Sequence, residues 1–245
     1  MGKLEQSPES HPTLVVTTAE AIRKLIFGGQ LPPGEHIVEG SIAQLLGVSH
    51  GTIRAALRAL QFEGIVEVRP RRGCFVRQFT DEDVREIYTL RNALEELAAR
   101  EASSKMSTGE RKHLRRIMKK MEAAISAGEV MEFIDLDFEY HQAIVDGAHH
   151  KLLKAAYSAL AAQTKMFMLM AWEDLPRSFL KGMAGLHQTL ADAVIDGKVD
   201  EAAGLAASHN NGTGEALAGL VRGRQHNDLV SVRTTAKVPR AAKAG

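Results

Sequence analysis

Hydrophobic and polar positions divide the chain into two regions with different patterns. Before residue 79, short helical patterns are followed by two alternating apolar runs, Ile65–Val68 and Cys74–Phe79, which Pro70 to Gly73 connect as a β-hairpin turn. From Thr80 onward the apolar residues recur only at helical spacing. This pattern predicts helices over 81–104, 108–127, 129–147, 149–173, 176–196 and 198–221. The sequence therefore predicts a mainly α protein whose second region, 80–221, is an all-α six-helix bundle.

The first region has the pattern of a winged helix-turn-helix domain over residues 14–78. Helices are predicted from Thr18, around 40–46 and over 51–63. The segment Gly47-Val48-Ser49 separates the second helix from the third, where glycine can adopt a positive φ and serine can cap the next helix. Two helices joined by such a short turn form a helix-turn-helix, and the hairpin that follows forms its wing.

The third predicted helix has one apolar face and one polar face. Ser49, His50, Thr52, Arg54 and Arg58 lie on or near the polar face. The N-terminal part of such a helix reaches base edges in the major groove, where arginine can bind guanine through two hydrogen bonds. The hairpin tip adds Arg69, Arg71 and Arg72, which suit phosphate or minor-groove contacts.

Charge is distributed in agreement with this division. Residues 50–77 contain six arginines and two glutamates, whereas residues 79–221 contain 16 basic and 22 acidic residues. A basic segment joined to an acidic body indicates a polyanion-binding part and a part with another task. Residues 1–13 are polar without periodicity and residues 222–245 are basic, so both ends are expected to be disordered.

Composition also limits the cellular setting that we expect. The chain has one cysteine, so it can form no disulfide within itself, and a reducing compartment fits. It contains no run of 18 apolar residues and no signal-peptide pattern near its beginning. We therefore expect a cytoplasmic protein without a membrane partner.

Four residues of the helical region form a possible metal-binding set. Asp137 and His141 are four residues apart, which places both on one helix face. His187 and His209 lie on two later helices, and Gly197 between them permits an antiparallel turn. One carboxylate and three imidazoles suit Zn, Ni, Mn or Fe, so ligand type leaves the metal open. Each residue also has a simpler explanation, as a hydrogen-bonded polar side chain of a helix.

The sequence resembles a known family. The segments LLGVSHGTIRAALRAL (Leu45–Leu60), Glu63–Val66 and Arg72–Val76 resemble the GntR family of bacterial transcription regulators, and the later helices resemble its FCD-type ligand-binding domain, of the FadR subfamily. The resemblance covers about residues 14–221 and implies DNA contacts by Ser49, Thr52, Arg54 and Gly73. His50 stands where the family usually has arginine, and Gly51 where threonine or proline is usual, so the operator sequence is not implied.

In the helical region the resemblance implies a metal site at Asp137, His141, His187 and His209. It also implies that Arg91 lines the ligand cavity and binds an organic carboxylate. Pairing of Arg91 with Glu95 at i,i+4 is the alternative. Leu186 stands where the family often has a glutamate before the histidine, which removes one outer support of that ligand.

The pattern and the resemblance together predict a homodimeric, sequence-specific transcription regulator, a repressor or an activator. It would bind double-stranded operator DNA and sense a small carboxylate. An enzyme is not expected. The alternative is a metal-dependent hydrolase with an accessory nucleic-acid-binding domain, because an open metal position can activate water. That reaction needs a general base, and Glu139 lies only two residues from Asp137, hence on another helix face.

Overall fold

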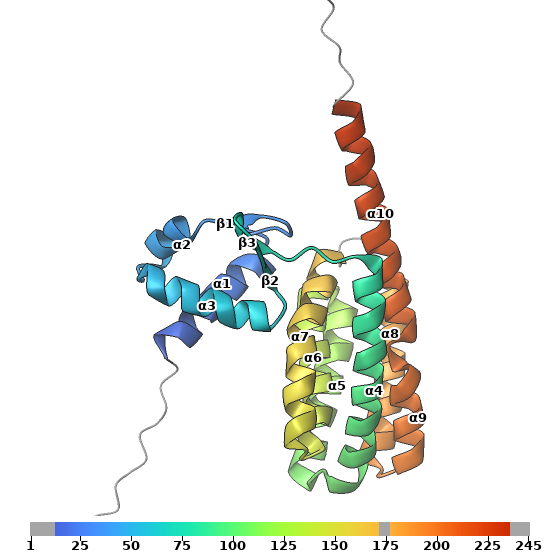
Figure 1. Ribbon diagram of the computed structural model, residues 1–245. Coiled ribbons are helices and arrows are strands. Elements are labelled where there is room, and N and C mark those ends of the chain that lie inside the picture. The colour runs from blue at the N-terminus through green and yellow to red at the C-terminus, as the bar shows by residue number, and fades with distance from the viewer. Residues whose placement is uncertain (1–12, 172–176, 236–245) are drawn as a thin grey trace, which may run out of the picture. The chain divides into compact units, whose positions relative to one another are not determined.

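The computed structural model describes residues 13–171 and 177–235 (Figure 1). The chain divides into two compact units, Met1–Gln78 and Phe79–Gly245. The first unit contains helices and a small sheet, and the second is helical throughout its described residues. The mainly α fold, with a winged helix-turn-helix followed by a helical domain, is confirmed.

The first unit consists of three helices and a three-stranded antiparallel sheet. Its elements are α1 (Leu14–Phe27), β1 (His36–Ile37), α2 (Glu39–Leu46), α3 (His50–Phe62), β2 (Val66–Arg69) and β3 (Gly73–Val76). Strand β3 is central, in the order β1-β3-β2, and pairs Gly73 with Arg69 next to the hairpin turn. Helix α1 packs on α3 over a core that includes Ile22, Ile53 and Leu60, all fully buried.

One local expectation for this unit was wrong, and one strand was not predicted. Helix α1 begins at Leu14 and is capped by Thr13, whereas Thr18 lies inside the helix with its hydroxyl bonded to the Leu14 carbonyl oxygen at 2.6 Å. The linking segment before α2 contains β1, which pairs with β3. A strand of two residues is too short to show a periodic pattern, so only its pairing partner identifies it.

The second unit is a helical bundle built around α4. Its elements are α4 (Asp81–Lys105), α5 (Thr108–Ala127), α6 (Val130–Gly147), α7 (Lys151–Ala171), α8 (Arg177–Ile195), α9 (Val199–His209) and α10 (Asn211–Thr235). Helix α4 packs against α6, α7, α9 and α10. Reciprocal capping boxes begin α4, at Thr80 with Asp83, and α5, at Ser107 with Glu110.

The end of the bundle differs from the prediction. The helix expected over 198–221 is two helices that break at Asn210, which gives seven helices among the described residues rather than six. Helix α10 continues to Thr235, so residues 222–235 are helical rather than a disordered tail. This stretch contains no proline and a single glycine, Gly223, so it holds no strong helix breaker. The expected disorder of 1–12 and 236–245 concerns residues outside the described part.

The sequence predicts no membrane-spanning helix. Among the described residues, none of the helices combines the length and the apolar composition that a membrane-spanning helix requires.

Candidate DNA-contacting surface and metal centre

The turn between α2 and α3 has the geometry that the sequence predicts. Gly47 ends α2 with φ +64°, in the left-handed region where glycine is favoured. Ser49 caps α3, and its Oγ accepts a hydrogen bond from the Thr52 backbone N–H at 3.1 Å. The Ser49 and Thr52 hydroxyl oxygens are also 2.8 Å apart, so both side chains are held at the start of the helix.

Helix α3 buries one face and leaves the predicted DNA contacts on the other. The buried residues are Ile53, Ala56, Leu57 and Leu60. Ser49, His50, Arg54 and Arg58 are exposed and Thr52 is half-buried. The Arg54 guanidinium donates from Nε to Oε2 of Glu39 on α2 at 2.7 Å, a partner that the sequence pattern did not indicate.

The wing presents its predicted residues at an exposed tip. Arg71, Arg72 and Gly73 are all exposed, and Arg71 has φ +60° while Gly73 has φ +99°. The φ of Gly73 lies in the left-handed region that favours glycine, and a Cβ atom there would lie 2.6 Å from Nε2 of His36. Below the tip, the Phe75 ring lies 5.8 Å from the Arg72 guanidinium carbon. The tip is therefore shaped by its backbone to expose two arginines.

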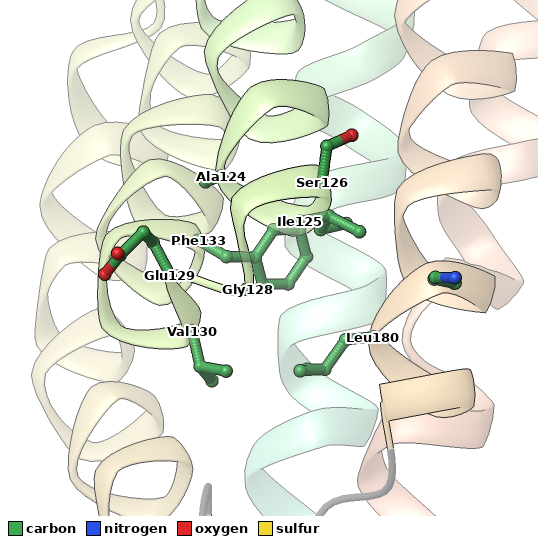
Figure 2. A pocket seen from close by; sticks show the side chains of 9 residues that line it. Ala124, Ile125, Ser126, Gly128, Glu129, Val130, Phe133 and Leu180 are labelled. Carbon is green, nitrogen blue, oxygen red and sulfur yellow. The ribbon is translucent and has the colours of Figure 1, made fainter.

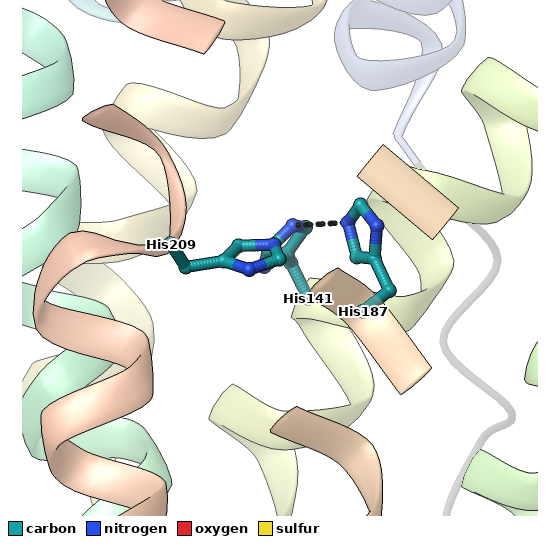
Figure 3. A group of neighbouring side chains, drawn as sticks. All are labelled: His141, His187 and His209. Carbon is teal, nitrogen blue, oxygen red and sulfur yellow. Dashed lines mark hydrogen bonds between the residues drawn. The ribbon is translucent and has the colours of Figure 1, made fainter. Parts of the chain in front are cut away.

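The four predicted metal ligands come together in the second unit. Asp137 and His141 belong to α6, His187 to α8 and His209 to α9, and all four are buried. One ring nitrogen from each histidine lies within 4.8 Å of those of the other two, and the three rings face one another (Figure 3). The Oδ1 atom of Asp137 is 2.8 Å from Nε2 of His187 and 3.8 Å from Nε2 of His141.

Hydrogen bonds at the outer ring nitrogens fix two of these histidines. His187 Nδ1 is 2.6 Å from the Met183 carbonyl oxygen, which can only accept, so Nδ1 carries the proton. His141 Nδ1 is 3.1 Å from Oε1 of Glu95 and donates to that carboxylate. In the neutral rings the lone pairs are therefore on Nε2, and the two Nε2 atoms are 3.2 Å apart (Figure 3). These outer partners orient the rings as metal-bound histidines are usually oriented.

Asp137 lacks the hydrogen bond that its position calls for. Its Oδ1 atom is 2.8 Å from Nε2 of His187, and this buried oxygen has no hydrogen-bond partner among the described residues. An unpaired buried carboxylate oxygen is costly. One unpaired carboxylate oxygen and two imidazole nitrogens thus meet in a buried site, which is the donor set that a divalent cation satisfies.

Glu95 on α4 links this centre to its surroundings. Its Oε1 accepts from Arg91 Nε at 2.7 Å and from the Tyr157 hydroxyl at 2.9 Å, and its Oε2 accepts from Asn210 Nδ2 at 2.7 Å. The i,i+4 pair considered for Arg91 is therefore present. Sequence reasoning missed Glu95 as the shared acceptor, because Tyr157 and Asn210 are remote in sequence.

Arg91 keeps one nitrogen free of this pair. Both Arg91 and Glu95 are buried, and Nη2 of Arg91 and the hydroxyl of Tyr88 are buried atoms with no hydrogen-bond partner in the described part of the chain. The Arg91 guanidinium carbon lies 5.5 Å from the Tyr88 ring centre. An anionic group placed here would satisfy both atoms.

Burial and neighbouring charges set the protonation of the site. Burial lowers the pKa of His141, and it lowers that of His209 to about 2, with the nearby His187 and His141 acting in the same direction. Burial opposes ionisation of Glu95, but Arg91 and His141 outweigh it and hold the pKa of Glu95 well below its usual range. The pKa of Asp137 is also lowered, since His187 and His141 outweigh its burial. The carboxylates are therefore charged and these two histidines are neutral near pH 7.

The remaining candidates lie apart from this centre. Glu139, considered as a general base, is half-exposed and pairs with the half-exposed His113 at 3.6 Å. Leu186 is 53% exposed and makes no polar support for His187. A cavity of about 220 Å³ lies where α5, α6 and α8 meet, and mainly apolar side chains such as Ile125, Val130 and Leu180 line it (Figure 2). None of the predicted metal ligands is among its lining residues.

Comparison with known proteins identifies the family. The model of bacterial regulatory proteins of the gntR family matches residues 14–76, and that of the FCD domain matches residues 86–212. The chain belongs to the GntR family. The resemblance expected from the helix-turn-helix and wing residues is thus confirmed, and the members of this family are transcription regulators rather than enzymes.

Relatives and solved structures agree with this assignment. A transcriptional regulator of Bacillus subtilis, YdhC, is 36% identical over 134 residues, 54% of this chain and 60% of that protein. A probable D-xylose utilization operon transcriptional repressor of Paenarthrobacter nicotinovorans is 30% identical over 188 residues, 74% of this chain and 80% of that protein. The structure of E. coli McbR/YncC has the same fold, with a TM-score of 0.75 at 18% identity, over 86% of this chain and 99% of that one.

Proposed function

We propose that this GntR regulator is a repressor whose affinity for operator DNA is controlled by a small organic acid bound at a divalent metal site. The ligands of that site would be Asp137, His141, His187 and His209. The observation that carries the proposal is the meeting of Asp137 Oδ1 with the Nε2 atoms of His141 and His187 in a buried site where this carboxylate oxygen has no hydrogen-bond partner among the described residues. A repressor role follows the name of the Paenarthrobacter relative.

The residues around the four ligands support the same assignment. Glu95 and the Met183 carbonyl hold the His141 and His187 rings with Nε2 directed inward. A bound divalent cation would take these lone pairs and leave coordination positions to a carboxylate oxygen. Arg91, whose pKa stays well above its ordinary value because Glu95 outweighs the effect of burial, keeps a positive charge beside the centre. Its free Nη2 and the Tyr88 hydroxyl suit the carboxylate of an organic acid.

DNA recognition is assigned to the first unit. Ser49, His50, Thr52, Arg54 and Arg58 on the exposed face of α3 would contact the major groove. Arg71, Arg72 and the Gly73 backbone at the wing tip would contact phosphates or the minor groove. Operators with two-fold symmetry imply that the chain binds as a homodimer.

Regulation requires a difference in affinity between two states. An effector alters operator binding only if it binds the DNA-competent state and the incompetent state with different affinity. The expected result is a change in operator affinity at saturating acid, in the presence of metal.

The metal is tested first, because the acid depends on it. Thermal unfolding of the full chain, stripped by chelator, is measured with Zn²⁺, Ni²⁺ or Mn²⁺ added. A ligand at about 100 times its dissociation constant should add about 2.7 kcal/mol of stability. His187→Asn should abolish the gain, whereas His113→Asn, which changes a half-exposed histidine outside the centre, should retain it. A gain that both variants retain, or no gain with any of the three ions, would contradict the metal site.

The acid is tested next on the metal-loaded protein. A panel of small carboxylic acids should include one that raises the melting temperature only when metal is present, and Arg91→Lys should weaken that effect. The same acid should change the affinity for an operator duplex. Unchanged operator affinity at saturating acid would show that the site binds an acid without regulating DNA binding.

A further inference from the structure

One ion pair joins the two helices of the helix-turn-helix on the surface that carries the predicted DNA contacts. Glu39 is the first residue of α2, and Arg54 lies one turn into α3. Their contact at 2.7 Å runs from Nε of Arg54 to Oε2 of Glu39. The two helix starts are in close proximity here, since a Cβ atom at Gly40 would lie 3.6 Å from Cε1 of His50. Glu39 therefore stands beside the base-reading end of α3.

The way in which Glu39 holds Arg54 differs from the other interhelical arginine pair in this unit. Arg23 binds Glu63 as a fork, with Nε and Nη2 donating to both carboxylate oxygens at 2.7 to 3.2 Å. Arg54 donates to Glu39 only through Nε, and within the described chain no other residue accepts from Arg54. Both terminal nitrogens of Arg54 therefore remain available.

Two free terminal nitrogens are what recognition of guanine requires. Arginine reads guanine by donating two hydrogen bonds, to O6 and N7, from one edge of the guanidinium. An exposed arginine without a partner samples many rotamers, and binding must restrict them. A carboxylate that holds Nε removes much of this freedom before DNA binds and leaves the opposite edge free.

We propose that Glu39 is a positioning residue for operator recognition, which aligns Arg54 so that its two terminal nitrogens bind one guanine in each half-site. The Arg54 side chain is 62% exposed and that of Glu39 34%, so the pair contributes little to folding and its effect falls on DNA binding. The competing role for Glu39 is a general one, in which its charge repels phosphates and weakens all DNA binding equally.

The test compares specific with non-specific binding. The full-length protein first selects its preferred duplexes from a random-sequence pool. Dissociation constants are then measured on a selected duplex and on an unrelated duplex of equal length. Glu39→Gln should lower the ratio of specific to non-specific affinity about 5- to 30-fold, the loss expected when one bidentate base contact is weakened. Glu63→Gln breaks the forked pair with Arg23 and should leave the ratio unchanged.

Base analogues identify the guanine that is read. Each guanine of the selected duplex is replaced in turn by 7-deazaguanine, which lacks the N7 acceptor. Wild type should lose affinity at one position per half-site at which Arg54→Ala is insensitive, and Glu39→Gln should show a reduced loss at that same position. Glu39→Asp, which keeps the carboxylate, should recover part of the wild-type loss.

Three results would overturn the proposal. If Glu39→Gln changes specific and non-specific affinity by the same factor, Glu39 acts only through its charge. If Arg54→Ala remains sensitive to 7-deazaguanine at every position that affects wild type, Arg54 does not read a guanine N7. If Glu39→Gln and Glu39→Asp both lose helical circular dichroism, the pair is structural.

Discussion

Two arginine–glutamate pairs, one in each unit, have the same nitrogen–oxygen distance but opposite surroundings. Arg54 and Glu39 meet at 2.7 Å, and so do Arg91 and Glu95. The first pair has side chains 62% and 34% exposed, whereas the second has 3% and 4%. Water screens the first pair and is excluded from the second.

The difference in exposure separates the tasks of the two units. The DNA-binding unit keeps its cations in water, where a polyanion can reach them without any change in the fold. The helical unit buries Arg91, Glu95 and Asp137 in its core, so the candidate metal centre depends on the packing of α4, α6, α8 and α9. Loss of one partner should therefore have a small effect on folding in the first unit and a large one in the second.

The largest expected effect is the loss of Glu95. Glu95→Ala leaves the buried Arg91 charge uncompensated and frees the Tyr157 hydroxyl and the Asn210 amide. Breaking a buried pair in this way costs about 3–5 kcal/mol of unfolding free energy. Glu39→Ala should cost less than about 1 kcal/mol, because its pair is exposed. Urea unfolding of both variants measures the difference, and equal losses would refute the distinction between the two pairs.

Local patterns were sufficient to predict most of the DNA-binding unit. The positive φ of Gly47, the Ser49 cap and the buried face of α3 are each fixed by neighbours in sequence, so the pattern of residues indicates them. The same holds for Asp137 and His141, which one turn of α6 brings to one face. What the sequence could not show is the short strand β1, because strand pairing defines it.

Contacts between remote segments were the part that the sequence could not provide. Tyr157 is 62 residues from Glu95, and Asn210 is 115 residues from it. No periodicity relates such positions, so the shared acceptor role of Glu95 appears only when α4, α7 and the α9–α10 junction pack together. The break between helices α9 and α10 at Asn210 also belongs to these remote contacts, because it places the Asn210 amide against Glu95.

An intermediate effect is expected for Arg54→Ala, and it should appear in binding rather than in folding. Loss of a base contact costs about 1–3 kcal/mol in specific operator binding and relaxes base choice at one position of each half-site. Stability should change by less than about 0.5 kcal/mol, as for other exposed sites. Arg115→Ala, an exposed arginine of α5, is the matched control and should bind the operator as wild type does. Uniform weakening on all sequences would instead make Arg54 a phosphate contact.

The smallest expected effect is the change in the stability of the chelator-stripped protein per pH unit. This change tests whether the buried histidines are neutral. The pKa values of His141 and His209 are lowered in the folded chain, mainly by burial. Below about pH 6.5 the unfolded chain binds protons that the folded chain does not, so stability must fall as pH falls. Each histidine contributes up to about 1.4 kcal/mol per pH unit.

Replacing His209 sharpens this expectation, because it removes one of the two contributions. Urea unfolding of His209→Asn between pH 7 and pH 5 should show a slope lower by up to about 1.4 kcal/mol per pH unit than that of wild type. Wild type measured in the same buffers is the reference. If His209→Asn retains the wild-type slope, His209 takes up protons in the folded state as readily as in the unfolded one. Burial would then not be what keeps the imidazole lone pairs of the proposed metal site free.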